Sequence, residues 1–507
     1  MEKRLVLAIA VSLLILLTWS SFVSKSYHIE NKGVTQDAPL LKAPVKQIPI
    51  EPSVSEAPSV SDSITYWGNE KIELAFSGPD ASIKEVNFQD YSSGFLTLRR
   101  GFYLATPGLS FKSKHSSAQE IIFEHEDGDK KIIKSFYFNG SPYYLDLELT
   151  ILNLASHSLT VDFPVVLGVL DFKGDQNNAR FQDISISTDE KLLRPNVHKE
   201  AQFNFSNFIA LRNRYFCLIV EPQEKDRITY FVKPDTAKES IIGFNFYDTV
   251  IPAGGQKDYK FHIYLGPQEL SKINQVNPAW SVIINYGVFD FISQLLLKLL
   301  NAINNIVHNL GWSIIILSLI IYLMLFPLTL KQMSSMKKMQ NLQPKIEELR
   351  KAYKDNPQKL NKEIMELYRH HKVNPLGGCL PMILQIPIFF ALYQALLRSV
   401  SLKGAPFLWI KDLSEPDRLF TFSNSLPLLG NEFNLLPILM SIGMFIQQKF
   451  SMQATSSGSA EQQKMMLVLF PVMFGFIFYR MPSGLVLYWF VNSILMLIYQ
   501  VRISRAK

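Results

Sequence analysis

The chain has 507 residues, of which 48% are apolar and only 19% are charged. Such a low charged fraction argues against a purely soluble protein and favours one with membrane and aqueous parts. The formal net charge is +7. Because the basic residues stand beside apolar spans, we attribute the positive charge to membrane topology and lipid binding rather than to DNA binding. The two cysteines, Cys217 and Cys379, fall in different regions, so no disulfide framework is indicated.

Residues 5–23 form an apolar run directly after Lys3 and Arg4. The run is longer than the usual signal-peptide core of about 7–15 residues, and no clear cleavage site follows it. We therefore predict that residues 1–23 are an uncleaved transmembrane anchor with a cytoplasmic N-terminus; a cleaved signal peptide is the alternative. Residues 24–63 are rich in Pro and Ser without apolar periodicity, which predicts an extended linker.

Residues 64–278 contain short alternating runs such as KKIIKSFYF and YYLDLELTILNL, bounded by Gly, Asn, Asp and Pro. Alternation with many β-branched and aromatic residues predicts strands, and a region of this length predicts a large β-sandwich. Because this region follows the first span, we expect it outside the cytoplasm.

Residues 279–308 change to a helical period. One apolar face is predicted, made of Ile284, Val288, Phe291, Leu295, Leu299, Ala302 and Ile306. An amphipathic helix just before a membrane span is expected to lie flat in the outer interface. The alternative is a core helix of the β domain.

Five further apolar spans follow, at residues 312–330, 376–400, 433–446, 465–479 and 485–499. With the first span this makes six, which places both termini in the cytoplasm. The charge distribution agrees, because the loop between the second and third spans and the C-terminal tail are both basic.

That basic loop, residues 331–373, carries two helical apolar patterns separated at Asp355-Asn356-Pro357. We predict a cytoplasmic helical hairpin, with Pro344 interrupting its first helix. Its basic face is either a solvated, topology-setting surface or a docking surface for anionic partners such as ribosomal RNA or lipid headgroups. The candidate partner-binding residues are Lys337, Lys338, Lys345, Arg350, Lys351 and Arg369.

No nucleotide-binding, metalloprotease, esterase or redox motif is present in the sequence. Glu366, His370 and His371 are close in sequence, but the two histidines point to different sides of a helix, which disfavours a metal site. We expect no metal, no cofactor and no catalytic residues. The spans also carry no acidic or basic residue at depth, which disfavours ion-coupled transport.

The spans do carry neutral polar residues, namely Ser318, Tyr322, Gln385, Ser441, Gln447 and Asn492. Each could simply hydrogen-bond to a neighbouring helix. Together they could line a hydrated groove, which would shorten the apolar path of an inserting polypeptide. Such a groove would lower the free-energy barrier to membrane insertion. A charged residue at the bilayer centre adds about 2.5–3.5 kcal/mol to that barrier.

Over residues 279–500 the chain resembles the YidC-type membrane protein insertases of Gram-negative form. The resemblance is carried by SIIILSLIIYLMLFPLT, MQNLQPKIEELR, KVNPLGGCLPMILQIPIFFALYQAL, APFLWIKDLS and MPSGLVLYWFVNSIL. It implies six transmembrane helices, five of them forming the core within residues 309–507, and an all-β periplasmic supersandwich. It also implies an inner-membrane insertase and folding chaperone, not an enzyme. Its partners would be nascent membrane proteins, the ribosome and the Sec translocon, with a groove open to the cytoplasm and lipid.

One position departs from the family. The family usually places an arginine in the groove one turn after a small hydroxyl residue; here Ser318 keeps the hydroxyl and Tyr322 replaces the arginine. Arg398 and Arg480 do not replace it, since both stand at outer ends of spans. We hypothesise a neutral groove that works by hydration, with Tyr322, Ser318, Gln447 and Trp489 as polar lining.

Two other functions remain open from the residues alone. A solute transporter would require ionisable groups in the spans or internal repeats, and neither is found. An envelope scaffold would require the β domain alone to support function. Deleting residues 70–265 distinguishes these readings, since an insertase would survive the deletion and a scaffold would not.

Overall fold

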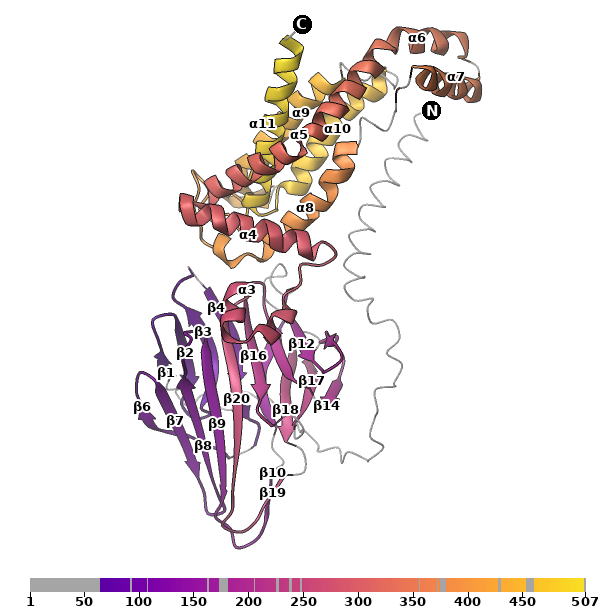
Figure 1. Cartoon of the computed structure of the whole chain (residues 1–507). Coiled ribbons are helices and arrows are strands. Elements are labelled where there is room, and N and C mark those ends of the chain that lie inside the picture. The colour runs from indigo at the N-terminus through magenta and orange to yellow at the C-terminus, as the bar shows by residue number, and fades with distance from the viewer. Residues whose placement is uncertain are drawn as a thin grey trace. The chain divides into compact units, whose positions relative to one another are not determined.

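The computed structural model divides into two compact units, each described separately below (Figure 1). The first ends at Gly266, and the second begins at Pro267 and also contains Phe88–Gly94. The structure describes residues 64–91, 94–106, 108–161, 164–172, 181–204, 206–224, 228–236, 239–246, 249–354, 356–371, 373, 380–426, 430–452 and 460–505. The predicted first span and linker, residues 1–63, and Cys379 therefore lie outside the described residues.

The first unit consists of antiparallel sheets that form a large β-sandwich, as predicted. Its largest sheet has nine strands, in the order β13 (Leu192–Leu193), β12 (Asp183–Ser187), β15 (Phe208–Arg212), β16 (Phe216–Pro222), β20 (Gln256–Pro267), β9 (Tyr144–Asn153), β8 (Lys130–Phe138), β7 (Glu120–Glu126) and β6 (Lys112–Ser116). The five-stranded sheet has the order β14 (Ala201–Asn204), β17 (Ile228–Thr236), β18 (Glu239–Phe246), β11 (Val165–Asp171) and β5 (Tyr103–Leu104).

Smaller sheets complete this unit. One has four strands in sequence order, β1 (Ile64–Gly68), β2 (Ile72–Ser77), β3 (Ser82–Phe88) and β4 (Gly94–Gly101). The other pairs β10 (Leu159–Val161) with β19 (Thr249–Ile251).

The alternating sequence pattern explains why β9 is a half-buried strand. Leu145, Leu147, Leu149 and Ile151 are buried, while the residues between them are only partly buried. Successive side chains of a strand point to opposite faces, so the leucine face packs into the core and the polar face remains accessible.

Strand β8 breaks this pattern at Lys134, which is 1% exposed. Its ammonium donates to the carbonyl oxygens of Phe102 at 2.8 Å and of Asp80 and Ala81 at 3.2 Å each. Three acceptors match the three N–H groups of an ammonium, which offsets much of the cost of burying it. Lys134 thus ties together two backbone segments that include the positive-φ residues Ala81 and Phe102.

The second unit is mainly helical. Its helices are α3 (Leu270–Val276), the 3₁₀ segment η3 (Pro278–Ile283), α4 (Asp290–Val307), α5 (Leu310–Asn341), α6 (Gln343–Ala352), α7 (Pro357–His370), α8 (Leu380–Arg398), the 3₁₀ turn η5 (Val400–Leu402), α9 (Leu435–Met452), α10 (Ala460–Phe478) and α11 (Ser483–Arg505). A short hairpin of β21 (Phe420–Leu426) and β22 (Gly430–Phe433) stands between η5 and α9.

The helix predicted over residues 279–308 is shorter than expected, because α4 begins at Asp290. Before it, Ile284 is extended and Gly287 has a φ of 88°, a left-handed value that suits glycine and interrupts the helix. The Asp290 carboxylate accepts from the Tyr286 amide at 2.7 Å and fixes the turn into α4.

The face of α4 that packs on the protein is a second apolar row, distinct from the row predicted to lie in the membrane interface. Leu296, Leu300 and Ile303 are buried together with Ser293, whose hydroxyl donates to the Ala391 carbonyl at 2.9 Å. Within the predicted row, Phe291 is 79% exposed and Ile306 is 80% exposed, whereas Ile284, which precedes α4, is buried. Helix α4 therefore has two apolar rows, and periodicity alone did not identify the one that faces the protein.

Apolar side chains fill the interior of the helical bundle and also cover much of its outside. A core cluster joins residues of α4, α5, α8, α9, α10 and α11, among them Leu317, Leu392, Met440 and Tyr488. Outward-facing Leu323, for example, is nevertheless 58% exposed. In the described part of the chain, Leu310–Lys331 and Ser483–Arg502 are long and apolar enough to cross a membrane. Shorter apolar helices are Leu435–Phe450 and Leu467–Phe478, so the count of six spans stays a prediction.

Residues 331–341 of the predicted loop continue α5, and the helical hairpin is formed by α6 and α7. Pro344 lies in the first turn of α6, after a break at Leu342, and the Asn356 side chain caps α7 by accepting from the Lys359 amide at 3.0 Å. Met339, Leu342, Ile346, Tyr368 and Val373 form a small core of their own.

Candidate functional site

The two candidate groove serines, Ser318 on α5 and Ser441 on α9, form hydrogen bonds within their own helices. Ser318 is fully buried, and its hydroxyl donates to the Ile314 carbonyl at 2.7 Å. Ser441 likewise donates to the Pro437 carbonyl at 2.8 Å. A hydroxyl bonded to the carbonyl one turn earlier needs no partner on a neighbouring helix, which suits a residue inside lipid. Gln447, further along α9, is partly buried.

Tyr322, at the position where the family usually has arginine, stands next to aromatic rings. Its ring lies 6.0 Å from Phe326, which in turn lies 5.1 Å from Tyr499 of α11. Among the described residues its hydroxyl oxygen is buried and has no hydrogen-bond partner. The side chain therefore places a neutral polar atom, rather than a charge, between α5 and α11.

A hydrogen bond between two helices brings three polar residues together. The Gln385 amide of α8 donates to the Tyr488 hydroxyl of α11 at 2.6 Å, and Tyr488 is fully buried. One turn further along α11, the Asn492 amide donates to the Tyr488 carbonyl at 3.0 Å. Two of the predicted residues, Gln385 and Asn492, thus meet around Tyr488, which the sequence analysis did not select.

Trp489 lies in an aromatic cluster. Its ring is 5.1 Å from Phe389, 5.7 Å from Phe474 and 5.4 Å from Phe478. These contacts join α8, α10 and α11 and show that the indole ring packs mainly against apolar neighbours. A part of Trp489 remains accessible.

Of the six predicted basic residues, two lie at the end of α5 and four on the α6–α7 hairpin, and five of the six are exposed. Arg350 is partly buried, and the other five are Lys337, Lys338, Lys345, Lys351 and Arg369. The ammonium of Lys345 lies 3.3 Å from Nε2 of His371. No group of three or more potential metal ligands occurs among the described residues, including His370 and His371.

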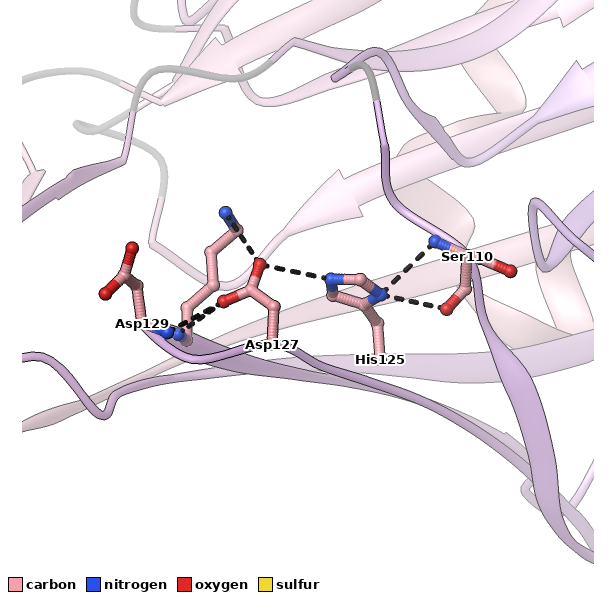
Figure 2. Close-up of polar contacts among 5 residues, drawn as sticks. Ser110, His125, Asp127 and Asp129 are labelled. Atoms are coloured by element: carbon pink, nitrogen blue, oxygen red, sulfur yellow. Dashed lines mark hydrogen bonds and ion pairs between the residues drawn. The ribbon is translucent and has the colours of Figure 1, made fainter.

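A Ser–His–Asp arrangement in the β domain has the residue types of a catalytic triad without its geometry (Figure 2). His125 contacts the backbone of Ser110, with Nδ1 2.8 Å from the carbonyl oxygen and 3.2 Å from the amide nitrogen. Figure 2 shows the Ser110 hydroxyl turned away from the imidazole, so no nucleophile is activated.

Asp127 has a structural task in the same cluster. Its Oδ1 accepts from the amides of Asp129 and Lys130 at 2.9 Å each, which closes the turn between β7 and β8. Burial acts to raise the pKa of Asp127, but these two amides, the Lys130 ammonium and His125 outweigh it and hold the pKa well below its usual range. Sequence reasoning missed this cluster because the contact between Ser110 and His125 depends on the fold.

Comparison with known proteins first defines the class. The family described as "60Kd inner membrane protein" matches residues 302–507, and the one described as "YidC periplasmic domain" matches residues 85–299. The chain is therefore an inner membrane protein with a periplasmic domain. The first match begins within α4, and the second covers most of the β-sandwich.

Individual relatives then identify the family. The membrane protein insertase YidC of Syntrophobacter fumaroxidans is 35% identical over 435 residues, which are 84% of this chain and 77% of the relative. That of Magnetococcus marinus is 30% identical over 577 residues, covering 100% of this chain and 99% of the relative. A crystal structure of an active YidC insertase has a TM-score of 0.42 at 20% identity, covering 87% of this chain and 93% of that one. The chain belongs to the membrane protein insertase YidC family, which is not a family of enzymes.

Proposed function

We propose that this protein inserts nascent proteins into the inner membrane and assists their folding, through a neutral polar groove open to the cytoplasm and to lipid. It would act alone or beside the Sec translocon, without covalent chemistry. Family membership supports the insertase activity. The proposal of a groove rests on the hydrogen bond between Gln385 and Tyr488, which lies inside a bundle whose outer faces are apolar.

The groove lowers the barrier by solvation. A polar segment crossing hydrocarbon must lose its hydration, and each central charge adds about 2.5–3.5 kcal/mol. Amide and hydroxyl groups at Gln385, Asn492 and Tyr322 can exchange their hydrogen bonds for bonds to water or to the substrate. Because these groups carry no net charge, they accept substrate segments of either sign.

The proposal also covers the α6–α7 hairpin and the membrane topology. The exposed basic residues of α6 and α7 would attract ribosomal RNA or anionic headgroups, an attraction that weakens as salt rises. The protein would cross the membrane six times, with both termini in the cytoplasm. Residues 1–23 would form the first span.

The test is insertion of a single-span substrate into vesicles containing this protein alone. The leading segment of the substrate would carry zero, two or four acidic residues, matched by a series with lysine. We expect insertion yields in the two series to fall in parallel, since the groove offers no counter-charge. A strong preference for the acidic series would overturn the neutral groove, and no insertion of any substrate would overturn the insertase proposal itself.

A matched variant makes the test internal to the protein. Tyr322→Arg introduces the charge that the family usually has, and we expect it to create a preference for acidic segments. Tyr322→Phe, which keeps the ring and removes the hydroxyl, controls for packing.

A further inference from the structure

The hairpin β21–β22 is a segment whose role neither the family match nor the groove explains. It belongs to the loop between α8 and α9. Phe420 pairs with Phe433 and Thr421 pairs with Glu432 in an antiparallel register. An isolated two-stranded hairpin is marginally stable in water, so another surface must support it.

One face of this hairpin is aromatic. The rings of Phe420 and Phe433 stack with centroids 4.6 Å apart, and Phe422 meets Phe420 edge-on at 5.3 Å. Phe420 is 45% exposed, and Phe422 and Phe433 are partly exposed. The opposite face is polar, with Thr421 and Ser423 exposed and Glu432 paired with Arg418 at 2.7 Å. The hairpin is therefore amphipathic across its two faces.

The base of the hairpin is fixed to the ends of the apolar helices. The Asn434 amide donates to the Tyr479 carbonyl at 2.7 Å, and the Tyr479 hydroxyl donates to the Glu432 carbonyl at 2.8 Å. Buried Asp417 accepts from the Leu436 amide at 2.8 Å and from the Trp409 indole at 3.1 Å. These bonds hold the hairpin against the start of α9 and the end of α10, so its depth follows that of the two helices.

The length of α9 indicates what covers the aromatic face. Its apolar run, Leu435–Phe450, is roughly 24 Å long at about 1.5 Å per residue. The hydrocarbon core of a bilayer is about 30 Å thick. The aromatic face stands directly before this run and extends the apolar surface of the protein on that side. At the same end of the bundle, Trp312 is 53% exposed and Leu408 is 73% exposed, so the apolar surface is not confined to the hairpin.

We propose that the aromatic face of β21–β22 is a membrane anchor, which lies in the acyl-chain region just below the headgroups of the outer leaflet. Phe420, Phe422 and Phe433 contact lipid, while Thr421 and Ser423 face water. The anchor fixes the outer ends of α9 and α10 at one depth in the bilayer. Burial of aromatic surface at the interface provides the binding free energy.

The test compares two adjacent residues of β21, whose side chains point to opposite faces. Phe422→Cys and Ser423→Cys are made separately in the full chain, with Cys217 and Cys379 replaced by alanine and serine. Each cysteine is labelled with the same environment-sensitive fluorophore, in vesicles of phosphatidylcholine and phosphatidylglycerol that contain no other protein. Quenching by a phosphatidylcholine spin-labelled near its headgroup and by aqueous iodide is then measured.

We expect spin-labelled lipid to quench the label at 422 at least about twofold more than the label at 423, with the reverse order for iodide. Equal quenching at both positions, or stronger lipid quenching at 423, would overturn the proposal. The two labels stand on adjacent residues of one strand and both variants are reconstituted by the same protocol, so mixed orientation in the vesicles affects both positions alike.

Varying the protein-to-lipid ratio distinguishes whether lipid or a second copy of the chain covers the aromatic face. Lipid quenching at 422 that is independent of the protein-to-lipid ratio supports the anchor. Quenching that rises as the protein is diluted would show that another copy covers the face, and would overturn it. Phe422→Leu, which remains apolar, should keep the thermal stability of the vesicle-bound protein, whereas Phe422→Asp should lower it; an equal effect of both would contradict the anchor.

Discussion

The β-sandwich and the helical bundle satisfy their buried polar groups in different ways. In the β-sandwich, the ammonium of Lys134 is held by carbonyls from residues 32 to 54 positions away in sequence. In the bundle, Ser318 and Ser441 bond to carbonyls four residues earlier in the same helix. A domain in water can use loops and strands as acceptors, because exposed backbone elsewhere is hydrated. A helix in lipid must satisfy its own backbone, and its small hydroxyls bond either within the helix or to a neighbouring helix, as Ser293 of α4 does to Ala391 of α8.

Replacing Lys134 tests the long-range half of this comparison and should have the largest effect. Lys134→Met keeps the apolar stem but removes the ammonium, so the carbonyls of Ala81 and Phe102 lose their donor in the core. We expect the β domain to lose about 2–4 kcal/mol of unfolding free energy. Urea unfolding of the solubilised protein, followed by circular dichroism, measures it.

Lys131 is the matched control on the same strand. It pairs with Glu126 at 2.9 Å and is 23% exposed. Lys131→Met should cost much less than Lys134→Met, since ion pairs open to solvent contribute little. Equal losses for the two variants would show that the buried bonds of Lys134 are not special.

Helix packing in the bundle is the next most sensitive feature. A Cβ atom at Gly475 of α10 would overlap Oγ of Ser441 on α9. Gly475→Ala should therefore lower the stability of the bundle by about 1–3 kcal/mol, seen as a lower thermal midpoint in detergent. Adding Ser441→Ala should restore it, since the closest remaining contact, with Cβ of residue 441, would be 3.4 Å.

Gly443 provides the control for the glycine itself. A Cβ atom at this position of α9 would have its nearest neighbours at 3.9 Å, so Gly443→Ala creates no clash. Alanine is the better helix former by about 1 kcal/mol. We expect Gly443→Ala to be neutral or stabilising; a loss as large as that of Gly475→Ala would mean that glycine is required in these helices for another reason.

The ionisation of Lys134 gives the β-sandwich a dependence on pH that the hydroxyls of Ser318 and Ser441 in the bundle do not share. Burial lowers the pKa of Lys134 from 10.5 to about 7, while nearby Asp80 acts to raise it. Between pH 7 and 10.5 the unfolded chain binds more protons than the folded one, so stability should rise with pH across this window. The slope should be at most about 1.4 kcal/mol per pH unit. Urea midpoints at about pH 7, 8 and 9, inside this window, measure it.

The variant Lys134→Met again provides the comparison. It should lack this component and show a flatter dependence on pH over the same range. Parallel curves for the wild type and the variant would contradict the assignment to Lys134.

The comparison also explains which parts of the fold the sequence could predict. Strands such as β8 and β9 follow directly from their alternating residues, and the large β-sandwich was predicted correctly. Helix α3 and the hairpin β21–β22 were missed, since both are short and carry no long periodic pattern. On α4 both apolar rows fit a helical period, so only packing against α5 and α8 distinguishes them.

The candidate site was less predictable than the fold for a physical reason. Composition identified neutral polar residues in the spans, but not which of them meet. Gln385 and Tyr488 are 103 residues apart, and their bond depends on how α8 packs on α11. Trp489 was predicted as polar lining, whereas its ring packs among phenylalanines.

The bond between Gln385 and Tyr488 joins two side chains of different helices, and testing it should give the smallest effect. Gln385→Leu, Tyr488→Phe and the double variant form a thermodynamic cycle. We expect a coupling energy of about 0.6 kcal/mol and at most about 1.7 kcal/mol, since hydrogen bonds between membrane helices are weak in net terms. Thermal unfolding of the four proteins in detergent measures it. The same cycle with Ser318→Ala in place of Gln385→Leu should give no coupling, because the Ser318 hydroxyl bonds within α5. A coupling of zero in the first cycle would mean that Gln385 is not held by Tyr488 in the membrane, and its amide would then be free to bind water or substrate from the outset.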